Sequence, residues 1–192
     1  MQVKEIPHTY RVKDTAPAPS GMTGVGRGPG LSSGPRLERG RQARMGMIHV
    51  CAERVVDASA GTVYGYLADM REHHPRFLPS AFSAFEVETG GVGEGTIARF
   101  TVIAGGRSRE YRMMVSGPEP GRVLTESDTV WCLVTTFTVT SRGATSRVRI
   151  CTTWQGAAGI GGLFAPRAMR RIYADELDRL NTDVCGQMNR HA

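Results

Sequence analysis

The chain has 192 residues, 40% of them hydrophobic, which is enough to fill one core and predicts one folded domain. It has no run of about 18 consecutive apolar residues and no signal-peptide pattern at its N-terminus, so we expect no integral membrane segment and a cytoplasmic location. The net charge of +6 is distributed unevenly along the chain. Residues 1–46 carry eight basic and three acidic residues, a net of +5, and the remainder carries sixteen and fifteen, a net of +1. The nearly neutral remainder argues against nucleic-acid binding by the folded part.

The first 46 residues are predicted to be a disordered basic tail. Residues 17–35 are rich in Pro, Gly and Ser, with too few large apolar side chains to offset the entropy of ordering. The glycine stretch 24–30 lacks the Gly-Lys-Ser/Thr ending of a phosphate loop, which favours a flexible linker. No aromatic residues interleave with the arginines, so we expect no nucleic-acid partner. Both lysines of the chain lie in this tail, and we hypothesise that translation starts at Met45 or Met47, where the globular pattern begins.

The four cysteines are Cys51, Cys132, Cys151 and Cys185, and they show neither C-x-x-C nor zinc-finger spacing. We therefore expect reduced, buried thiols and no metal site. Cys51 and Cys151 would face each other if the first and last predicted strands pair, and geometry would then decide whether they bond.

From Met47 onward the pattern predicts regular structure. Residues 47–56 are rich in β-branched side chains and indicate a strand. Asp57 or Ser59 is then expected to cap a short helix. A second helical turn follows and ends at Pro75 or Pro79, because proline cannot continue the backbone hydrogen bonding.

Six more segments have strand character: 82–88, 96–103, 107–116, 122–128, 130–140 and 145–154. Glycine-rich separators such as 104–106 and 117–121 are typical of loops that join antiparallel strands. The glycine loop at 90–95 precedes a strand, which argues against a dinucleotide site. Three sets of residues alternate onto a common apolar face: Tyr111, Met113 and Val115; Trp131, Leu133, Phe137 and Val139; and Val148, Ile150, Thr152 and Trp154.

A long C-terminal helix is predicted from about residue 163, with Pro166 in its first turn. One stripe carries its apolar side chains: Met169, Tyr173, Leu177, Leu180, Val184 and Met188. The helix must bury this stripe against the sheet.

The order of strand, two short helices, six strands and one long helix resembles the START/Bet v 1-like superfamily, also called SRPBCC. The resemblance covers residues 47–188. Segments 55–69, 74–80, 85–96 and 118–126, the last with its Glu-Pro-Gly-Arg turn, are similar to the bacterial polyketide cyclase/dehydrase-like branch. The resemblance implies an α+β helix-grip fold, in which a curved seven-stranded antiparallel sheet wraps around the long C-terminal helix and two short helices follow the first strand.

The family also implies a deep cavity between sheet and helix for a hydrophobic small-molecule ligand. We expect no cofactor. Members of the family carry ligands, sense them, or catalyse ring closure or dehydration, so the fold alone is weak evidence for chemistry. The sequence leaves the oligomeric state open. The residues predicted to line the pocket are Phe77, Phe100, Tyr111, Met113, Trp131, Phe137, Trp154, Met169, Tyr173 and Leu177. Core packing is the competing interpretation for each of them, and we expect about half to contact a ligand.

The candidate catalytic residues are His73, His74 and Tyr111. An imidazole titrates near neutrality and would serve as a general base towards a polyketone, although a histidine that packs or caps in a loop is the competing interpretation. Tyr111 would donate to a developing enolate. Arg112 and Arg99 are out of phase with the apolar faces of their strands, so they are expected at the surface.

Ligand binding is therefore the first functional hypothesis, because no strong catalytic motif accompanies the apolar faces. The alternative is a cofactor-independent polyketide cyclase or dehydratase that acts by general acid/base catalysis and enolate stabilisation.

Overall fold

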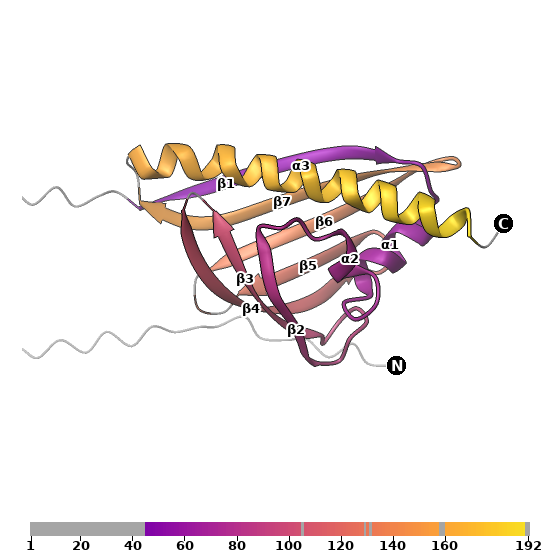
Figure 1. Ribbon diagram of the computed structural model, residues 1–192, viewed down its shortest axis with the longest axis horizontal. Helices are drawn as coiled ribbons and strands as arrows, with labels where there is room; N and C mark the ends of the chain where they lie inside the picture. The colour runs from indigo at the N-terminus through magenta and orange to yellow at the C-terminus, as the bar shows by residue number, and fades with distance from the viewer. Residues whose placement is uncertain (1–44, 105, 129, 131, 158–159, 191–192) are drawn as a thin grey trace, which may run out of the picture. The chain divides into compact units, whose positions relative to one another are not determined.

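A seven-stranded antiparallel sheet and three helices make up the part of the chain that the structure, a computed structural model, describes (Figure 1). This part comprises residues 45–104, 106–128, 130, 132–157 and 160–190. The elements are β1 (Met45–Val56), α1 (Ala60–Ala68), α2 (His74–Phe77), β2 (Phe82–Thr89), β3 (Ile97–Ala104), β4 (Arg107–Glu119), β5 (Val123–Asp128), β6 (Leu133–Arg142), β7 (Thr145–Ala157) and α3 (Ile160–Met188). The predictions for residues 1–44 and for Trp131 lie outside the described residues.

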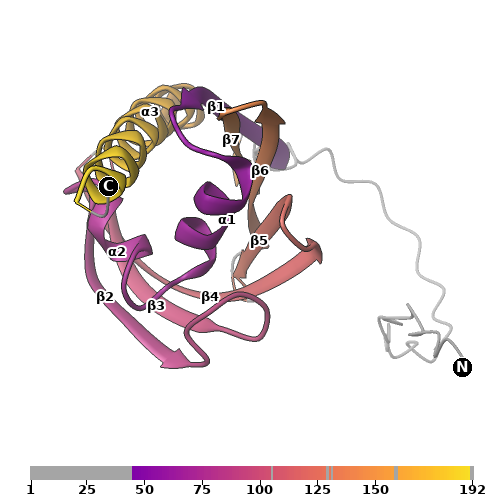
Figure 2. The ribbon, with the colours of Figure 1, turned by 90° about the vertical axis from the view of Figure 1, so that its right-hand side faces the viewer.

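The sheet order is β1-β7-β6-β5-β4-β3-β2, so the first and last strands of the chain are neighbours. Seen end-on, the sheet curves around α1 and α2, and α3 runs between the β1 side and the β2 side of the curve (Figure 2). This arrangement confirms the predicted helix-grip fold. No helix in these residues is long and apolar enough to cross a membrane.

Local chemistry explains the short helices. Ser59, rather than Asp57, caps α1: its hydroxyl oxygen accepts a hydrogen bond from the Thr62 N–H at 3.2 Å. The Asp57 N–H instead donates to the side chain of Asn181 on α3 at 2.9 Å. The helix α2 has Pro75 in its first turn and stops before Pro79, as the proline positions predict.

The helix α3 differs from the prediction at both ends. It begins at Ile160, so Pro166 lies inside the helix instead of in its first turn. Proline has no N–H, so the carbonyl four residues earlier lacks its helical partner, a loss the helix tolerates here. At the other end the buried stripe stops at Val184, and Met188 is 46% exposed.

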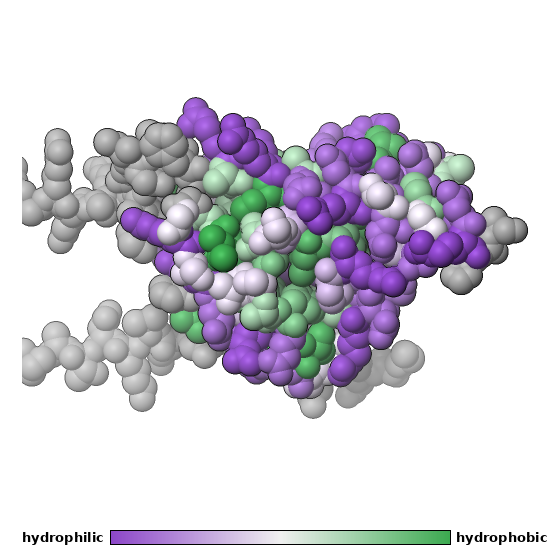
Figure 3. Space-filling view, viewed as in Figure 1, coloured by the Kyte–Doolittle hydropathy of each residue, from purple (hydrophilic) through white to green (hydrophobic). Residues whose placement is uncertain are grey.

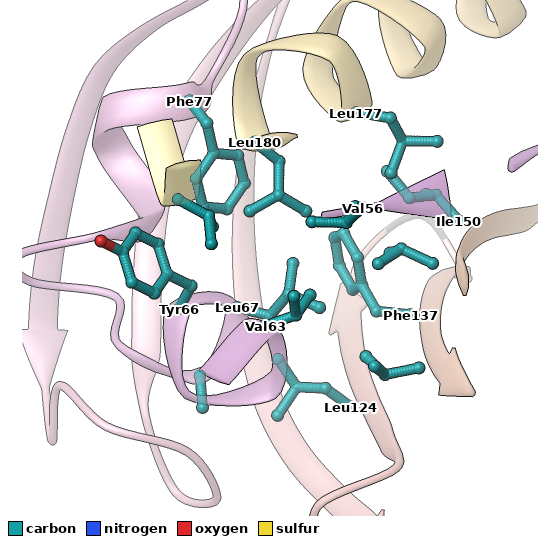
Figure 4. Packing of buried hydrophobic residues seen from close by; sticks show 14 of the residues in the cluster. Val56, Val63, Tyr66, Leu67, Phe77, Leu124, Phe137, Ile150, Leu177 and Leu180 are labelled. Atoms are coloured by element: carbon teal, nitrogen blue, oxygen red, sulfur yellow. The ribbon is translucent and has the colours of Figure 1, made fainter. Parts of the chain in front are cut away.

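Most of the interior is a packed apolar core. Figure 4 shows side chains from α1, α2, the second half of α3 and the sheet meeting there, among them Leu67, Phe77, Phe137 and Leu180. A smaller cluster on β3 and β4 consists of Phe100, Val102 and Met113. Partly buried side chains of β2, β3, β4 and β6 pack against it: Phe82, Phe85, Ala104, Tyr111 and Leu133. Hydrophobic side chains also reach the surface in the middle of the face shown in Figure 3.

The register of β1 and β7 corrects one prediction. Cys51 lies directly opposite Cys151, with the two Cα atoms 4.2 Å apart, and the two sulfurs form a disulfide. The expectation of free thiols is wrong for this pair, because the closure of the sheet between the first and last strands places the side chains on the same face. Cys132 and Cys185 are free, but neither is fully buried.

Candidate functional site

A group of polar side chains lies within the otherwise apolar interior. The members that contact one another or interact electrostatically come from α2, β5, β6, β7 and α3, and they are His74, Glu126, Thr135, Thr152, Tyr173 and Glu176. Ionisable groups are rarely fully buried unless they are paired, because losing contact with water is costly. We therefore treat this group as the candidate site.

His74 contributes a neutral imidazole. Its Nδ1 atom lies 3.0 Å from the carbonyl oxygen of Leu67. Because a carbonyl only accepts, the ring proton is on Nδ1, and Nε2 presents a lone pair. The ring is 3% exposed and packs against Phe77 and Phe137, with ring centres 4.8 Å and 5.9 Å away. Burial lowers the pKa of His74 to about 4, so the imidazole is uncharged at neutral pH.

Glu126 contributes a carboxyl group on the inner face of β5. Its Oε1 atom is 3.7 Å from Nε2 of His74, too long for a hydrogen bond, and no hydrogen-bond partner reaches it from the described residues. Burial raises the pKa of Glu126 to about 7, so the carboxyl group is present in both protonation states near neutrality. Near neutral pH, the acceptor nitrogen of His74 therefore faces a carboxyl group that can donate in its protonated state.

The helix α3 adds a second carboxyl group and a hydroxyl group. Burial, followed by the charges of Glu126 and Asp175, raises the pKa of Glu176 well above its usual range. The Tyr173 hydroxyl lies 2.5 Å from the Thr152 hydroxyl, which in turn lies 2.8 Å from that of Thr135. Burial raises the pKa of Tyr173, so this chain of hydroxyls stays uncharged.

This arrangement has defined chemical capabilities. The His74 Nε2 atom can accept a proton or a hydrogen bond, and protonated Glu126 can donate one. Each has a pKa displaced towards the neutral form, so neither is trapped as an ion at neutral pH. The pair can bind a ligand hydroxyl or carbonyl group, or move a proton.

The structure separates the two adjacent histidines. His73 lies towards the surface, where its Nδ1 atom contacts Oδ2 of Asp69 at 2.8 Å and its ring packs on Tyr66 at 4.1 Å. Burial acts to raise the pKa of Asp69, but hydrogen bonds from the Glu72 N–H, from His73 and from a further backbone N–H lower it overall. His73 thus helps to shape the turn after α1, while His74 points into the interior.

Tyr111 is half-buried and faces inward with Met113, as the alternation predicts. Its ring lies 6.1 Å from that of Phe100. The two arginines lie on the outer face: Arg112 pairs with Glu88 at 2.7 Å, and Arg99 pairs with Glu86 at 2.6 Å. The structure therefore does not bring an arginine to Tyr111, which agrees with the expectation from strand phase.

The predicted pocket-lining residues within the described part of the chain fall into four groups. Phe77, Phe137 and Leu177 belong to the packed core, and Phe100, Tyr111 and Met113 belong to the cluster on β3 and β4. Trp154 and Met169 are partly buried at the edge of the core, and Tyr173 joins the hydroxyl chain. That any of these residues contacts a ligand stays a prediction.

Sequence reasoning missed Glu126, Glu176, Thr135 and Thr152 as members of the site. The sequence does carry a signal for the two carboxyl groups. Glu126 lies two residues after Leu124 and therefore on the same, buried face of its strand, and Glu176 lies three residues after Tyr173 on the buried side of α3. Both carboxyl groups are overlooked when the buried face of an element is inferred from its apolar residues alone.

Comparison with known proteins agrees with this fold. The family model described as "Polyketide cyclase / dehydrase and lipid transport" matches residues 47–184. The KanY protein is 30% identical over 73% of this chain and 99% of its own, with a TM-score of 0.66. TTHA0849 from Thermus thermophilus is 21% identical over 73% and 99% of the two chains, with a TM-score of 0.61. The ZhuI aromatase/cyclase from Streptomyces is 19% identical over 72% and 94%, with a TM-score of 0.55.

A search of curated proteins finds no match to the chain. The family match covers most of the chain, and these relatives are matched over nearly their whole length. The chain therefore belongs to the polyketide cyclase/dehydrase and lipid transport family of SRPBCC, Bet v 1-like proteins, whose members bind hydrophobic ligands or act as cyclases.

Proposed function

We propose that this domain binds a hydrophobic small molecule of lipid, polyketide or isoprenoid type that carries a hydroxyl or carbonyl group. The observation that carries the proposal is the Oε1 atom of Glu126, which is buried without a partner 3.7 Å from Nε2 of His74. A buried polar atom without a hydrogen bond costs about 1–3 kcal/mol. A ligand hydroxyl group that donates to one of these atoms and accepts from the other would offset that cost.

The surroundings suit such a ligand. Aromatic side chains flank one member of the pair: Phe77, Phe85 and Phe137 lie around the His74 ring. Binding sites for small molecules are typically apolar with a few polar groups that fix orientation. The apolar walls would supply affinity, and the pair formed by Glu126 and His74 would select the polar group.

The test compares matched ligands and matched variants. Fatty alcohols, polyketide phenols and isoprenols would be paired with analogues that lack the oxygen, and binding measured by native mass spectrometry and thermal shift. We expect Glu126→Leu to lower the affinity for the oxygenated ligand about tenfold or more and to leave the affinity for its analogue unchanged. Glu53→Gln, on the exposed outer face of β1, is the control. Equal losses for both ligands, or no binding by any ligand class, would refute the proposal.

A second candidate is a cofactor-independent cyclase or dehydratase, favoured by the protonation states of the same pair. Neutral His74 would take the proton next to a substrate carbonyl, and protonated Glu126 would donate to the developing enolate oxygen. Tyr111 and His73 remain candidates from the sequence. Turnover of a poly-β-keto thioester would be measured for His74→Ala, Glu126→Gln, Tyr111→Phe and His73→Ala. We expect the first two to lose about 100-fold or more in kcat, and unchanged rates would exclude this mechanism.

A further inference from the structure

A second cluster of reactive side chains lies on the outer face of the sheet, where β1 pairs with β7. His49 and Cys51 are two residues apart on β1, so they share a face, and Cys151 is opposite Cys51. The ring nitrogen of His49 and the two sulfurs lie within 4.8 Å of one another. Val50, between the two β1 residues, is fully buried on the other face. The cluster therefore lies on the opposite side of the sheet from Glu126 and His74.

The orientation of His49 is set by a neighbour. Its Nδ1 atom lies 3.0 Å from the hydroxyl oxygen of Thr153, the residue opposite it on β7, and its Nε2 atom lies 3.0 Å from the Cys51 sulfur. In the tautomer that carries the proton on Nδ1, His49 donates to the Thr153 hydroxyl and the Nε2 lone pair faces the sulfur atoms. A disulfide sulfur has no proton to donate to that lone pair. A cation held between the nitrogen and two thiolates would satisfy all three atoms.

We propose that His49, Cys51 and Cys151 form a zinc site when the two cysteines are reduced. Two thiolates and one imidazole are ligands that zinc prefers, and three protein ligands leave a fourth position for water or another small ligand. In the Nδ1-protonated tautomer, the hydrogen bond from His49 to the Thr153 hydroxyl is the outer contact that typically orients a metal-bound histidine. Two thiolates balance the charge of Zn²⁺, so the Arg149 guanidinium, 3.6 Å from the Cys51 sulfur, can donate to a ligating thiolate without opposing a net positive centre.

Zinc and the disulfide are alternative states of the same sulfur atoms. A dithiol reductant supplies two electrons and two protons, the bond between Cys51 and Cys151 breaks, and the reductant becomes a disulfide. Zinc binding then releases one proton from each thiol to solvent. Paired cysteines persist as thiols in reducing compartments, where such arrangements more often bind metal.

The test uses the full chain with Cys132→Ser and Cys185→Ser, which leaves only the paired cysteines. After reduction by a phosphine and its removal without oxygen, the protein is titrated with Co²⁺, which reports thiolate ligation through near-ultraviolet charge-transfer absorption. We expect one Co²⁺ per chain, displaced by Zn²⁺, and no binding to the oxidised protein. His49→Ala should weaken Co²⁺ binding about tenfold or more. Cys51→Ser leaves a single thiolate, so the charge-transfer absorption expected for two thiolate ligands should be lost.

Two outcomes would overturn the proposal: no stoichiometric thiolate absorption in the reduced protein, or a Co²⁺ affinity that His49→Ala leaves unchanged. Circular dichroism of each variant shows that the sheet is intact. Arg147→Ala, on the same outer face of β7 but away from the three ligands, is the matched control and should bind as the parent does.

Discussion

The Nε2 atom of His74 and the Oε1 atom of Glu126 lie 3.7 Å apart inside the protein, and burial displaces the pKa of each group towards its neutral form. The two displacements have opposite signs on the pH scale. Glu126 binds its proton more tightly in the folded chain, and His74 binds its proton less tightly. The pair therefore makes stability depend on pH in two separable ways.

Replacement of Glu126 by Gln tests the first displacement. The pKa of Glu126 in the folded chain, about 7, exceeds the usual value of 4.5. Its contribution to the free energy of unfolding is therefore full below about pH 4.5 and is lost as the pH rises through about 7. Glu126→Gln removes this loss. Between about pH 5 and about pH 8, we expect the free energy of unfolding of the variant to rise relative to that of wild type by up to about 3 kcal/mol, measured by urea unfolding. A difference that does not change with pH, or an equal change in Glu53→Gln, would contradict the assignment.

Replacement of His74 by Leu tests the opposite displacement. The folded pKa, about 4, is below the usual 6.5, so the contribution of His74 is full above about pH 6.5 and is lost as the pH falls through about 4. The variant cannot take up this proton on unfolding. We expect its stability to fall less than that of wild type between about pH 6.5 and about pH 4, although Leu costs the hydrogen bond to Leu67 at every pH. Parallel pH curves for the two proteins would contradict this.

The hydroxyl chain from Thr135 through Thr152 to Tyr173 links the sheet to α3. Thr152→Val removes the middle member and leaves two buried hydroxyls without it, so we expect a loss of about 1–3 kcal/mol in the free energy of unfolding. Tyr173→Phe should cost less, because Thr152 keeps its contact with Thr135. Thr140→Val, at an exposed position of β6, is the control. Equal losses in the free energy of unfolding for all three variants would contradict a stabilising role of the hydroxyl chain.

The fold follows from local patterns, which explains why it was predictable. Alternation along β4 and β7 and the stripe on α3 each report which side of an element is buried, and they need no knowledge of distant partners. The site is different, because it depends on which elements the curvature brings together. Nothing local to residue 126 indicates that the imidazole of His74, on α2, will lie beside it.

The disulfide shows the same limit. Pairing of the first and last strands placed Cys51 and Cys151 on neighbouring strands, but a shift of one residue in register would have put them on opposite faces. Geometry within the folded sheet decided the outcome. Reading apolar periodicity alone also concealed Glu176, which occupies a buried position on the helix stripe.

Reduction of the disulfide should lower the stability of the domain. The bond joins residues 100 positions apart, so it restricts a long loop in the unfolded chain. A native disulfide typically contributes about 2–4 kcal/mol. We expect the reduced protein, two hydrogens heavier by mass, to unfold at a lower urea concentration, and the double variant Cys132→Ser with Cys185→Ser to match wild type in its oxidised form. An intact mass that shows four free thiols before reduction would contradict the pairing.

Substitutions at two of the predicted pocket-lining residues should differ in their effect on the free energy of unfolding. Phe77 on α2 is fully buried in the packed core, beside Leu180 of α3 (Figure 4), so Phe77→Ala should leave a cavity and cost about 3–5 kcal/mol. Tyr111 is only half-buried beside the cluster on β3 and β4 and loses only its hydroxyl group in Tyr111→Phe, so the free energy of unfolding of that variant should stay within about 1 kcal/mol of wild type.

Ligand affinity then separates packing from binding at these two positions. A ligand that enters between β4 and α3 would lose affinity in Tyr111→Phe while the free energy of unfolding stays nearly unchanged, because only the hydroxyl group is removed. Both quantities would be measured on the same preparations by urea unfolding and titration. If Tyr111→Phe alters neither, Tyr111 belongs to the core cluster alone, and the polar end of the ligand is left to His74 and Glu126.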